Sequence, residues 1–237
     1  MNKAEWIFDE TKSVGVDYFN EDLVKQYDNE HEKFRTFDDE ANKIAHAIGL
    51  TKESLLLDIG CGTGGLTTRF ASMCSRVYAV DSSPAMLNIL KSKIEHQNLS
   101  NVSLIQAGLL SYEHNGDKLD AVVANLCLHH LPDFWKQIAL NKLNSYIKPG
   151  GKLFICDVVF SFNPDEYVSA INEWIDEMRA MAGNQMADET LLHVKDEYST
   201  WDWIMSGMLE RAGFCIDNNS EIMRNMRIYI CTKIEAL

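Results

Sequence analysis

Short apolar runs alternate with amphipathic segments through the middle of the chain. The runs have the length and aliphatic content of buried strands, and they lie at 55–59, 77–81, 102–105, 119–125 and 152–159. Between them, apolar residues spaced three or four apart predict helices, for example over 66–73 and 133–146. Strands that alternate with helices are typical of a parallel sheet covered by helices on both faces. The pattern therefore predicts an α/β fold.

The last third of the chain predicts a helical insertion followed by two strands. Apolar residues recur at steps of three and four over 164–183, and a further helix is expected over 200–212. Apolar runs at 214–216 and 227–231 predict an antiparallel hairpin at the edge of the sheet. We therefore expect about seven strands, with a substrate-side helical insertion at about 160–200, before the sixth.

The first fifty residues show helical spacing as well. Phe37, Ala41 and Ile44 recur at steps of four and three. The sequence has only four prolines and no low-complexity stretch, so no linker divides it. We expect residues 1–50 to form a helical N-terminal lid packed on a core domain that comprises residues 51–237.

Composition and charge exclude several classes of protein. With 237 residues and 46% hydrophobic positions, the chain is long enough to bury a full core. Its formal net charge is −13, and both ends of the sequence are acidic while the middle is nearly neutral. Because nucleic acids are bound largely through their phosphates, a protein this acidic is not expected to bind DNA or RNA non-specifically.

The sequence also predicts a cytoplasmic location. The first residues lack the basic and apolar segments of a secretory signal, and no apolar stretch is long enough to cross a membrane. The six cysteines are widely scattered without a Cys-x-x-Cys pair: Cys61, Cys74, Cys127, Cys156, Cys215 and Cys231. We expect reduced core thiols, with no disulfide and no metal site.

A glycine-rich segment follows the first predicted strand. Gly60, Gly62 and Gly65 match the pattern G-x-G-x-x-G between a strand and a helix, where glycines let a nucleotide-bearing ligand approach the backbone. Asp81 ends the second predicted strand, from which a carboxylate can accept hydrogen bonds from both ribose hydroxyls. Strand, loop, helix and acid in this order predict a nucleotide cofactor.

Two cofactors are compatible with such a loop, and charge favours one of them. A dinucleotide would place its doubly anionic pyrophosphate near Asp58, two residues before the first glycine, which is unfavourable. S-adenosylmethionine instead brings a sulfonium and an ammonium group. A nicotinamide-dependent oxidoreductase and a non-catalytic S-adenosylmethionine-binding module remain as alternatives to a methyltransferase.

Five segments together resemble the class I S-adenosylmethionine-dependent methyltransferases. They are 57–64, 80–87, 119–125, 128–131 and 147–151. The resemblance implies a Rossmann-like α/β fold, with a mostly parallel seven-stranded sheet, an antiparallel last strand, a helical N-terminal lid and a helical insertion before strand six. It also implies the cofactor S-adenosylmethionine, the product S-adenosylhomocysteine and a small-molecule methyl acceptor.

The resemblance assigns twelve residues to the cofactor site. They are Asp58, Gly60, Cys61, Gly62, Gly64, Asp81, Ser82, Met86, Gly108, Leu109, Asn125 and Leu126. Gly60 and Gly62 would line the methionine part, and Asp81 would hold the ribose. Met86 would pack on the adenine. Asn125 and Leu126 would border the sulfonium.

One departure from the family pattern concerns the adenine. Members of the family commonly have an aspartate after the third strand that contacts the adenine amine, but residues 106–110 contain no acid here. The backbone of Gly108 and Leu109 is expected to serve the adenine edge instead.

Methyl transfer places few demands on the protein, because the methyl carbon is already activated and needs mainly a positioned nucleophile. A general base helps when the acceptor is protonated or poorly nucleophilic. His129 and His130, just after the fourth strand, are the candidate bases, with Tyr27 and Asp157 as further candidates. If the acidic ends of the chain reach the pocket, they favour a neutral or cationic acceptor. We expect a monomer or homodimer that binds neither nucleic acid nor membrane.

Overall fold

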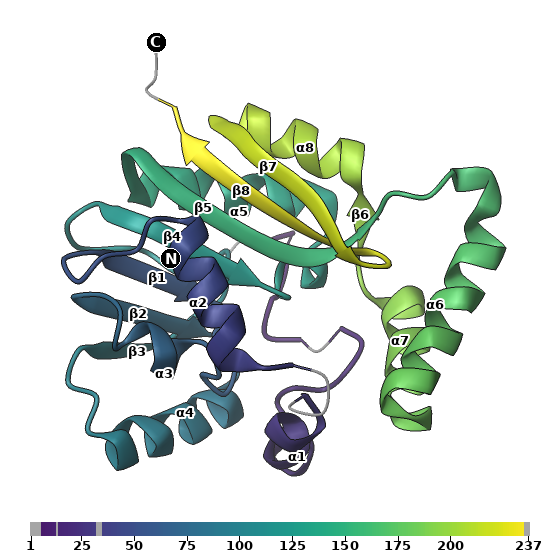
Figure 1. Cartoon of the computed structure of the whole chain (residues 1–237), viewed down its shortest axis with the longest axis horizontal. Coiled ribbons are helices and arrows are strands. Elements are labelled where there is room, and N and C mark those ends of the chain that lie inside the picture. The colour runs from purple at the N-terminus through teal and green to yellow at the C-terminus, as the bar shows by residue number, and fades with distance from the viewer. Residues whose placement is uncertain (1–5, 13, 32–34, 235–237) are drawn as a thin grey trace.

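A computed structural model describes residues 6–12, 14–31 and 35–234 of the protein. Its centre is a sheet in the order β3-β2-β1-β4-β5-β8-β7, with the short β6 beside β5 (Figure 1). The strands are β1 Leu55–Ile59, β2 Arg76–Asp81, β3 Val102–Gln106, β4 Leu119–Asn125, β5 Ile147–Phe160, β6 Thr200–Trp201, β7 Phe214–Met223 and β8 Met226–Lys233. Strands β1 to β6 pair in parallel, whereas β8 is antiparallel to both β5 and β7. The predicted α/β fold, with its mostly parallel sheet and antiparallel last strand, is confirmed.

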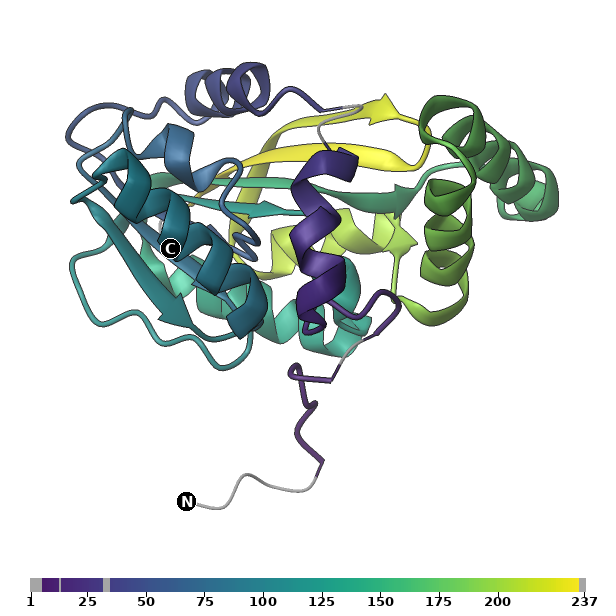
Figure 2. The same cartoon turned by 90° about the horizontal axis from the view of Figure 1, so that it is seen from below.

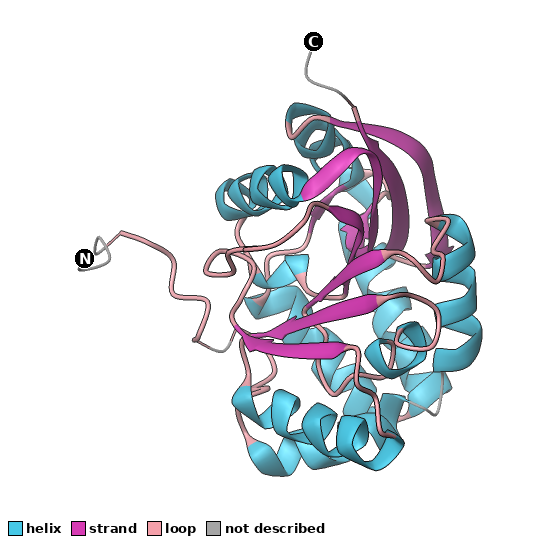
Figure 3. Ribbon diagram, turned by 90° about the vertical axis from the view of Figure 1, so that its left-hand side faces the viewer, coloured by secondary structure: helices cyan, strands magenta, loops and turns pink. Residues whose placement is uncertain are grey.

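Helices cover both faces of the twisted sheet (Figure 3). They are α1 Glu21–His31, α2 Phe37–Ala47, α3 Thr67–Phe70, α4 Pro84–Gln97, α5 Asp133–Tyr146, α6 Tyr167–Ala182, α7 Asn184–Asp196 and α8 Asp202–Arg211. Two short 3₁₀ helices span Leu128–His130 and Pro164–Glu166. No described helix is long and apolar enough to cross a membrane.

The two faces of the sheet carry separate apolar layers because side chains alternate along each strand. Leu57 and Ile59 of β1 point to the layer formed with α5 and α8. Leu56, between them, points to the layer formed with α2 and α3, which contains Phe37 and Phe70. Burial of both faces explains why the strands read as continuous apolar runs in the sequence.

The ends of the chain differ in part from the sequence-based expectation. No helix is found over the described residues before α1, which form turns and bends (Figure 2), although helical spacing was expected over 1–50. Gly183 ends α6 as expected, but a further helix, α7, follows it directly. Strand β8 lies between β5 and β7, so the hairpin contributes only β7 to the edge.

The carboxyl ends of β1, β2 and β4 face the same side because these strands are parallel. The helices α6 and α7 stand side by side beyond this edge, and α1 lies near it (Figure 1). Val24 of α1 packs against Ala85 and Met86 of α4. This edge is thus bordered by α1, from the predicted N-terminal lid, and by α6 and α7, from the predicted insertion.

Candidate functional site

A cavity of about 360 Å³ lies at this edge of the sheet. Most of the residues that the sequence assigns to a cofactor line it: Gly60, Gly62, Asp81, Ser82, Met86, Gly108, Leu109, Asn125 and Leu126. The candidate bases His129 and His130 and the candidate Tyr27 also line it. Three assigned residues, Asp58, Cys61 and Gly64, do not line the cavity.

The glycine loop has a backbone that other residues would strain. Gly60 has a φ of +71°, and a Cβ placed there would lie 2.5 Å from the Cβ of Cys127. The next glycine of the loop, Gly62, donates its N–H to Asp81 at 2.8 Å. The loop is therefore held against the end of β2, close to the chain that follows β4.

Asp81 joins the loop to the start of α4. Its two carboxylate oxygens accept hydrogen bonds from the N–H groups of Gly62 and Ser83, each at 2.8 Å. Burial raises the pKa of Asp81, and the backbone hydrogen bonds oppose that increase. The carboxylate is thus fixed in orientation and lies on the cavity wall.

Asp58 is a second acid behind the loop. Only 2% of its surface is exposed, and its carboxylate accepts a hydrogen bond from the hydroxyl of Thr67 at 2.5 Å. Burial raises the pKa of Asp58 to about 7, the Thr67 hydrogen bond opposes this, and the charges of Asp81 and Glu40 add to the increase. A cation bound near the loop would favour the ionised form of this carboxyl.

The end of β4 presents an unusual polar atom. The Oδ1 of Asn125 is buried and accepts no hydrogen bond among the described residues, while its Nδ2 donates to Glu40 at 3.2 Å. Glu40 in turn pairs with Arg35 at 2.7 Å. The next residue, Leu126, has a φ of +56°, a strained conformation that recurs at functional sites.

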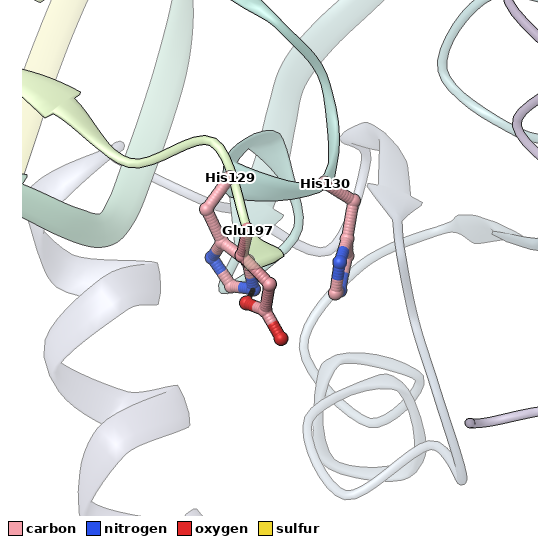
Figure 4. A group of neighbouring side chains, drawn as sticks. All are labelled: His129, His130 and Glu197. Atoms are coloured by element: carbon pink, nitrogen blue, oxygen red, sulfur yellow. Dashed lines mark ion pairs between the residues drawn. The ribbon is translucent and has the colours of Figure 1, made fainter. Parts of the chain in front are cut away.

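A buried cluster of ionisable side chains follows β4. His129 Nδ1 lies 2.5 Å from a carboxylate oxygen of Asp157. Its Nε2 lies 3.3 Å from a carboxylate oxygen of Glu197, which Figure 4 shows beside it. Burial alone would lower the pKa of His129, but these two carboxylates outweigh it and raise the pKa. Glu197 also pairs with His193 of α7. The two carboxylates therefore favour the protonated form of His129.

His130 has the opposite character. Burial, together with the charge of His129, lowers the pKa of His130 to about 3. The ring is partly exposed on the cavity wall and packs edge-on against Tyr18. Donor atoms of His129, His130 and Glu197 lie within 4.8 Å of one another, a separation suited to a metal ion.

Tyr27, the third candidate base, is poorly suited to accept a proton. Burial raises the pKa of its phenol, so the hydroxyl keeps its proton at neutral pH. Its neighbour Asp28 accepts a hydrogen bond from Thr63 of the glycine loop and pairs with Lys93 of α4. These two contacts of Asp28 connect α1 to the glycine loop and to α4.

The far side of the cavity is apolar and comes largely from the insertion. Trp174 and Met178 of α6 and Met186 of α7 line it. The contribution of α7 was not predicted from the sequence, although Met186, Thr190 and His193 have the spacing of one helical face. Glu197 and Glu10 were not predicted either, because the sequence carries no local signal for them.

Comparisons with known proteins agree with this geometry. Residues 56–151 match a family model described as a methyltransferase domain. The chain is 26% identical over 194 residues to an uncharacterized methyltransferase of Geobacillus sp. (strain WCH70), covering 81% of this chain and 83% of that protein.

Two solved structures share the fold. A SAM-dependent methyltransferase from Aquifex aeolicus has a TM-score of 0.65 at 17% identity, over 91% of this chain and 99% of that one. A magnesium protoporphyrin IX methyltransferase from Synechocystis, solved with bound SAM, has a TM-score of 0.64 at 16% identity, over 97% of this chain and 100% of that one. The matched family argues against the nicotinamide-dependent alternative.

Proposed function

We propose that this chain, which matches a methyltransferase domain over residues 56–151, is a class I S-adenosylmethionine-dependent methyltransferase that transfers a methyl group from S-adenosylmethionine to a small-molecule acceptor held in the cavity described above. The observation that carries this proposal is the unpartnered Oδ1 of Asn125 beside the glycine loop. A buried acceptor without a donor is costly, and a cationic ligand such as an ammonium or sulfonium group would relieve it.

The remaining residues of the cavity fit the same cofactor. Asp81 presents a fixed carboxylate suited to ribose hydroxyls, and Met86 lines the same wall. Acidic side chains outnumber basic ones on the cavity wall: Glu10, Glu40, Asp81, Glu189 and Glu197, against Lys12, Arg35 and His129, whose raised pKa favours its protonated form. This balance supports a cationic cofactor and disfavours a pyrophosphate.

The same charges bear on the acceptor. The walls contributed by α6, α7 and the residue after α7 combine apolar side chains with Glu189 and Glu197. We expect an acceptor with an apolar body and a neutral or positively charged polar group, because an anionic group would face these carboxylates. Phosphorylated acceptors are disfavoured for the same reason.

When bound, S-adenosylmethionine supplies a methyl carbon bonded to a positively charged sulfur, so the protein needs no nucleophilic residue of its own. The residues here position the acceptor and exclude water. His129 holds a proton between Asp157 and Glu197, and we assign it the role of fixing Glu197. His130 is a neutral imidazole that accepts a hydrogen bond from the acceptor and orients its nucleophilic atom. Tyr27 serves as a hydrogen-bond donor.

The segments outside the core form the walls of the acceptor site. Tyr18 and Tyr27 reach the cavity from the N-terminal part of the chain, and Trp174 and His193 reach it from α6 and α7. We therefore propose that residues 1–50 act as a lid and that the insertion at about 160–200 selects the acceptor.

A screen with two readouts tests the proposal. Mass spectrometry of small molecules retained on native purification should detect S-adenosylmethionine or S-adenosylhomocysteine. Incubation with S-adenosylmethionine and a panel of amines, thiols and phenols should then release S-adenosylhomocysteine with at least one class. Binding of the cofactor without turnover of any acceptor would instead support a non-catalytic binding module.

A further inference from the structure

The carboxylate of Glu10 is anchored to the chain that follows β3. Its Oε2 accepts a hydrogen bond from the N–H of Leu110 at 2.8 Å, and its Oε1 accepts one from the N–H of Ser111 at 2.7 Å. Two backbone donors on the two oxygens fix both the position and the plane of the carboxylate. An acid from the beginning of the chain thus reaches residues a hundred positions later.

Gly108 leaves the space that this carboxylate occupies. A Cβ placed on Gly108 would lie 2.3 Å from both the carboxyl carbon and the Oε2 of Glu10. Side chains cannot approach that closely, so an aspartate or alanine at this position and the observed placement of Glu10 exclude each other. The glycine that replaces the family's usual aspartate after β3 is therefore matched by an acid from elsewhere.

The segment that carries Glu10 has further contacts with the core. The ring of Phe8 lies 6.4 Å from that of Trp135 and 6.2 Å, edge-on, from that of Tyr198, measured between centroids. The N–H of Thr11 donates to the carboxylate of Asp9 at 3.2 Å, forming a tight turn around Glu10. The acid is thus held from both sides along the chain.

Glu10 lines the same cavity as Gly108, Leu109, Asp81 and Met86. We propose that Glu10 is the residue that recognises the 6-amino group of the cofactor's adenine, supplied by the N-terminal segment in place of an acid after β3. This inference rests on the proposed function, since it presumes that S-adenosylmethionine is the ligand of the cavity.

The chemistry of the carboxylate suits this role. Each oxygen already accepts one backbone N–H and has a further lone pair for an amino hydrogen. A purine with an oxygen at position 6 would instead place an acceptor against the carboxylate, so that the two oxygens repel and the 6-oxo group gains no donor from Glu10. Glu10 therefore selects for adenine over hypoxanthine.

Calorimetry with two ligands tests the inference. S-adenosylhomocysteine and its 6-oxo analogue, S-inosylhomocysteine, differ at the recognised position. We expect the unmodified protein to prefer the adenine ligand by at least about tenfold, the size expected when a buried polar group loses its partner. Glu10→Gln should weaken S-adenosylhomocysteine binding by about tenfold and reduce the preference to about twofold or less, because an amide can also donate to the 6-oxo group.

Glu21→Gln is the matched control, since this exposed acid in the first turn of α1 does not line the cavity. It should retain both the affinity and the preference. Gly108→Ala is a second test, because its added methyl group displaces the Glu10 carboxylate without changing its charge. It should reduce the preference as Glu10→Gln does, with the unfolding temperature measured to verify that each variant is folded.

The outcomes separate this inference from the proposed function. If the unmodified protein does not bind S-adenosylhomocysteine, the proposed function fails and the inference fails with it. If the unmodified protein binds it while Glu10→Gln and Gly108→Ala both keep the affinity and the adenine preference within twofold, the proposed function stands and the role of Glu10 is overturned.

Discussion

Asp58 makes the stability of the protein depend on pH in a direction that is unusual for an aspartate. Burial raises its pKa from the usual 3.8 to about 7 in the folded protein. Below pH 3.8 the carboxyl is protonated in both the folded and the unfolded states. Between 3.8 and about 7 the unfolded chain loses the proton while the folded protein keeps it, so the free energy of unfolding falls as pH rises.

The magnitude follows from the same two values. A tenfold difference in ionisation constant corresponds to about 1.4 kcal/mol. A carboxyl with a pKa of 3.8 when unfolded and about 7 when folded therefore destabilises the protein by about 4 kcal/mol at pH 8 relative to pH 3. The side chain is almost fully buried, so solvent does not reduce this figure substantially.

Asp58→Asn removes the ionisation and keeps an oxygen that can accept the hydrogen bond from Thr67. Urea unfolding of both proteins from pH 4 to pH 8 gives the difference in unfolding free energy, in which contributions from other groups cancel. From pH 4 to pH 8, the free energy of unfolding of the unmodified protein should fall by about 3–4 kcal/mol relative to that of the variant.

Asp217 provides a control because its pKa is shifted in the opposite direction from that of Asp58. Burial would raise the pKa of Asp217, but hydrogen bonds from Thr232 and Lys152 outweigh it and hold the pKa below its usual value. Asp217→Asn should therefore change the relative stability only towards pH 4, with the unmodified protein losing stability as pH falls. A difference between Asp58→Asn and the unmodified protein that stays constant within about 1 kcal/mol would refute the assignment of a raised pKa.

Two further substitutions probe the loop and the acceptor side. Gly60→Ala should lower the free energy of unfolding by about 2–4 kcal/mol and weaken cofactor binding, because the new Cβ meets Cys127. Gly150 has a similar φ of +74° but open space around it, so Gly150→Ala should lower the free energy of unfolding in urea by only about 1 kcal/mol. Equal losses of unfolding free energy in Gly60→Ala and Gly150→Ala would contradict the steric argument. His130→Phe keeps a ring but removes the nitrogens, and kcat/KM for the acceptor should fall about five- to tenfold with an unchanged Kd for S-adenosylhomocysteine. That reduction should be constant from pH 5 to pH 9, since a group with a pKa of about 3 does not titrate there; a reduction that varies with pH would contradict the neutral imidazole.

The core of the fold was predictable because its signals are local. Helix α5 was expected over 133–146 and has these bounds. The start of α4 carries a local signal too: the hydroxyl of Ser83 accepts the N–H of Met86 at 3.2 Å, and Pro84 lies in the first turn. Buried parallel strands are apolar on both faces, so their residues stand out in the sequence.

Helix α7 was missed for a physical reason. Among its described positions only Ala187 and Thr190 are buried, so the helix has little apolar periodicity. It also begins directly after Gly183, without the Ser, Asp or Pro that often marks a helix start. Because the helix was not predicted, the residues that α7 contributes to the site were not predicted either.

Contacts between residues that are far apart in the sequence could not be predicted either. Glu197 meets His129, and Glu10 meets Leu110, only because the chain folds back on itself. Neither acid belongs to a motif, and acidic residues are common at both ends of this sequence. The strand-end residues Asp81 and Asn125 were predictable because parallel strands bring their carboxyl ends to one edge.

The central claim is that the Asp81 carboxylate and the adjoining glycine loop bind S-adenosylmethionine. Isothermal titration calorimetry of S-adenosylhomocysteine against the unmodified protein, Asp81→Ala and the control Asp117→Ala tests it most directly. Asp117 is exposed and does not line the cavity. We predict that Asp81→Ala weakens binding at least about tenfold, consistent with the loss of hydrogen bonds to a charged group, while Asp117→Ala binds as the unmodified protein does. Equal affinity of all three proteins, with each shown to be folded, would contradict the account.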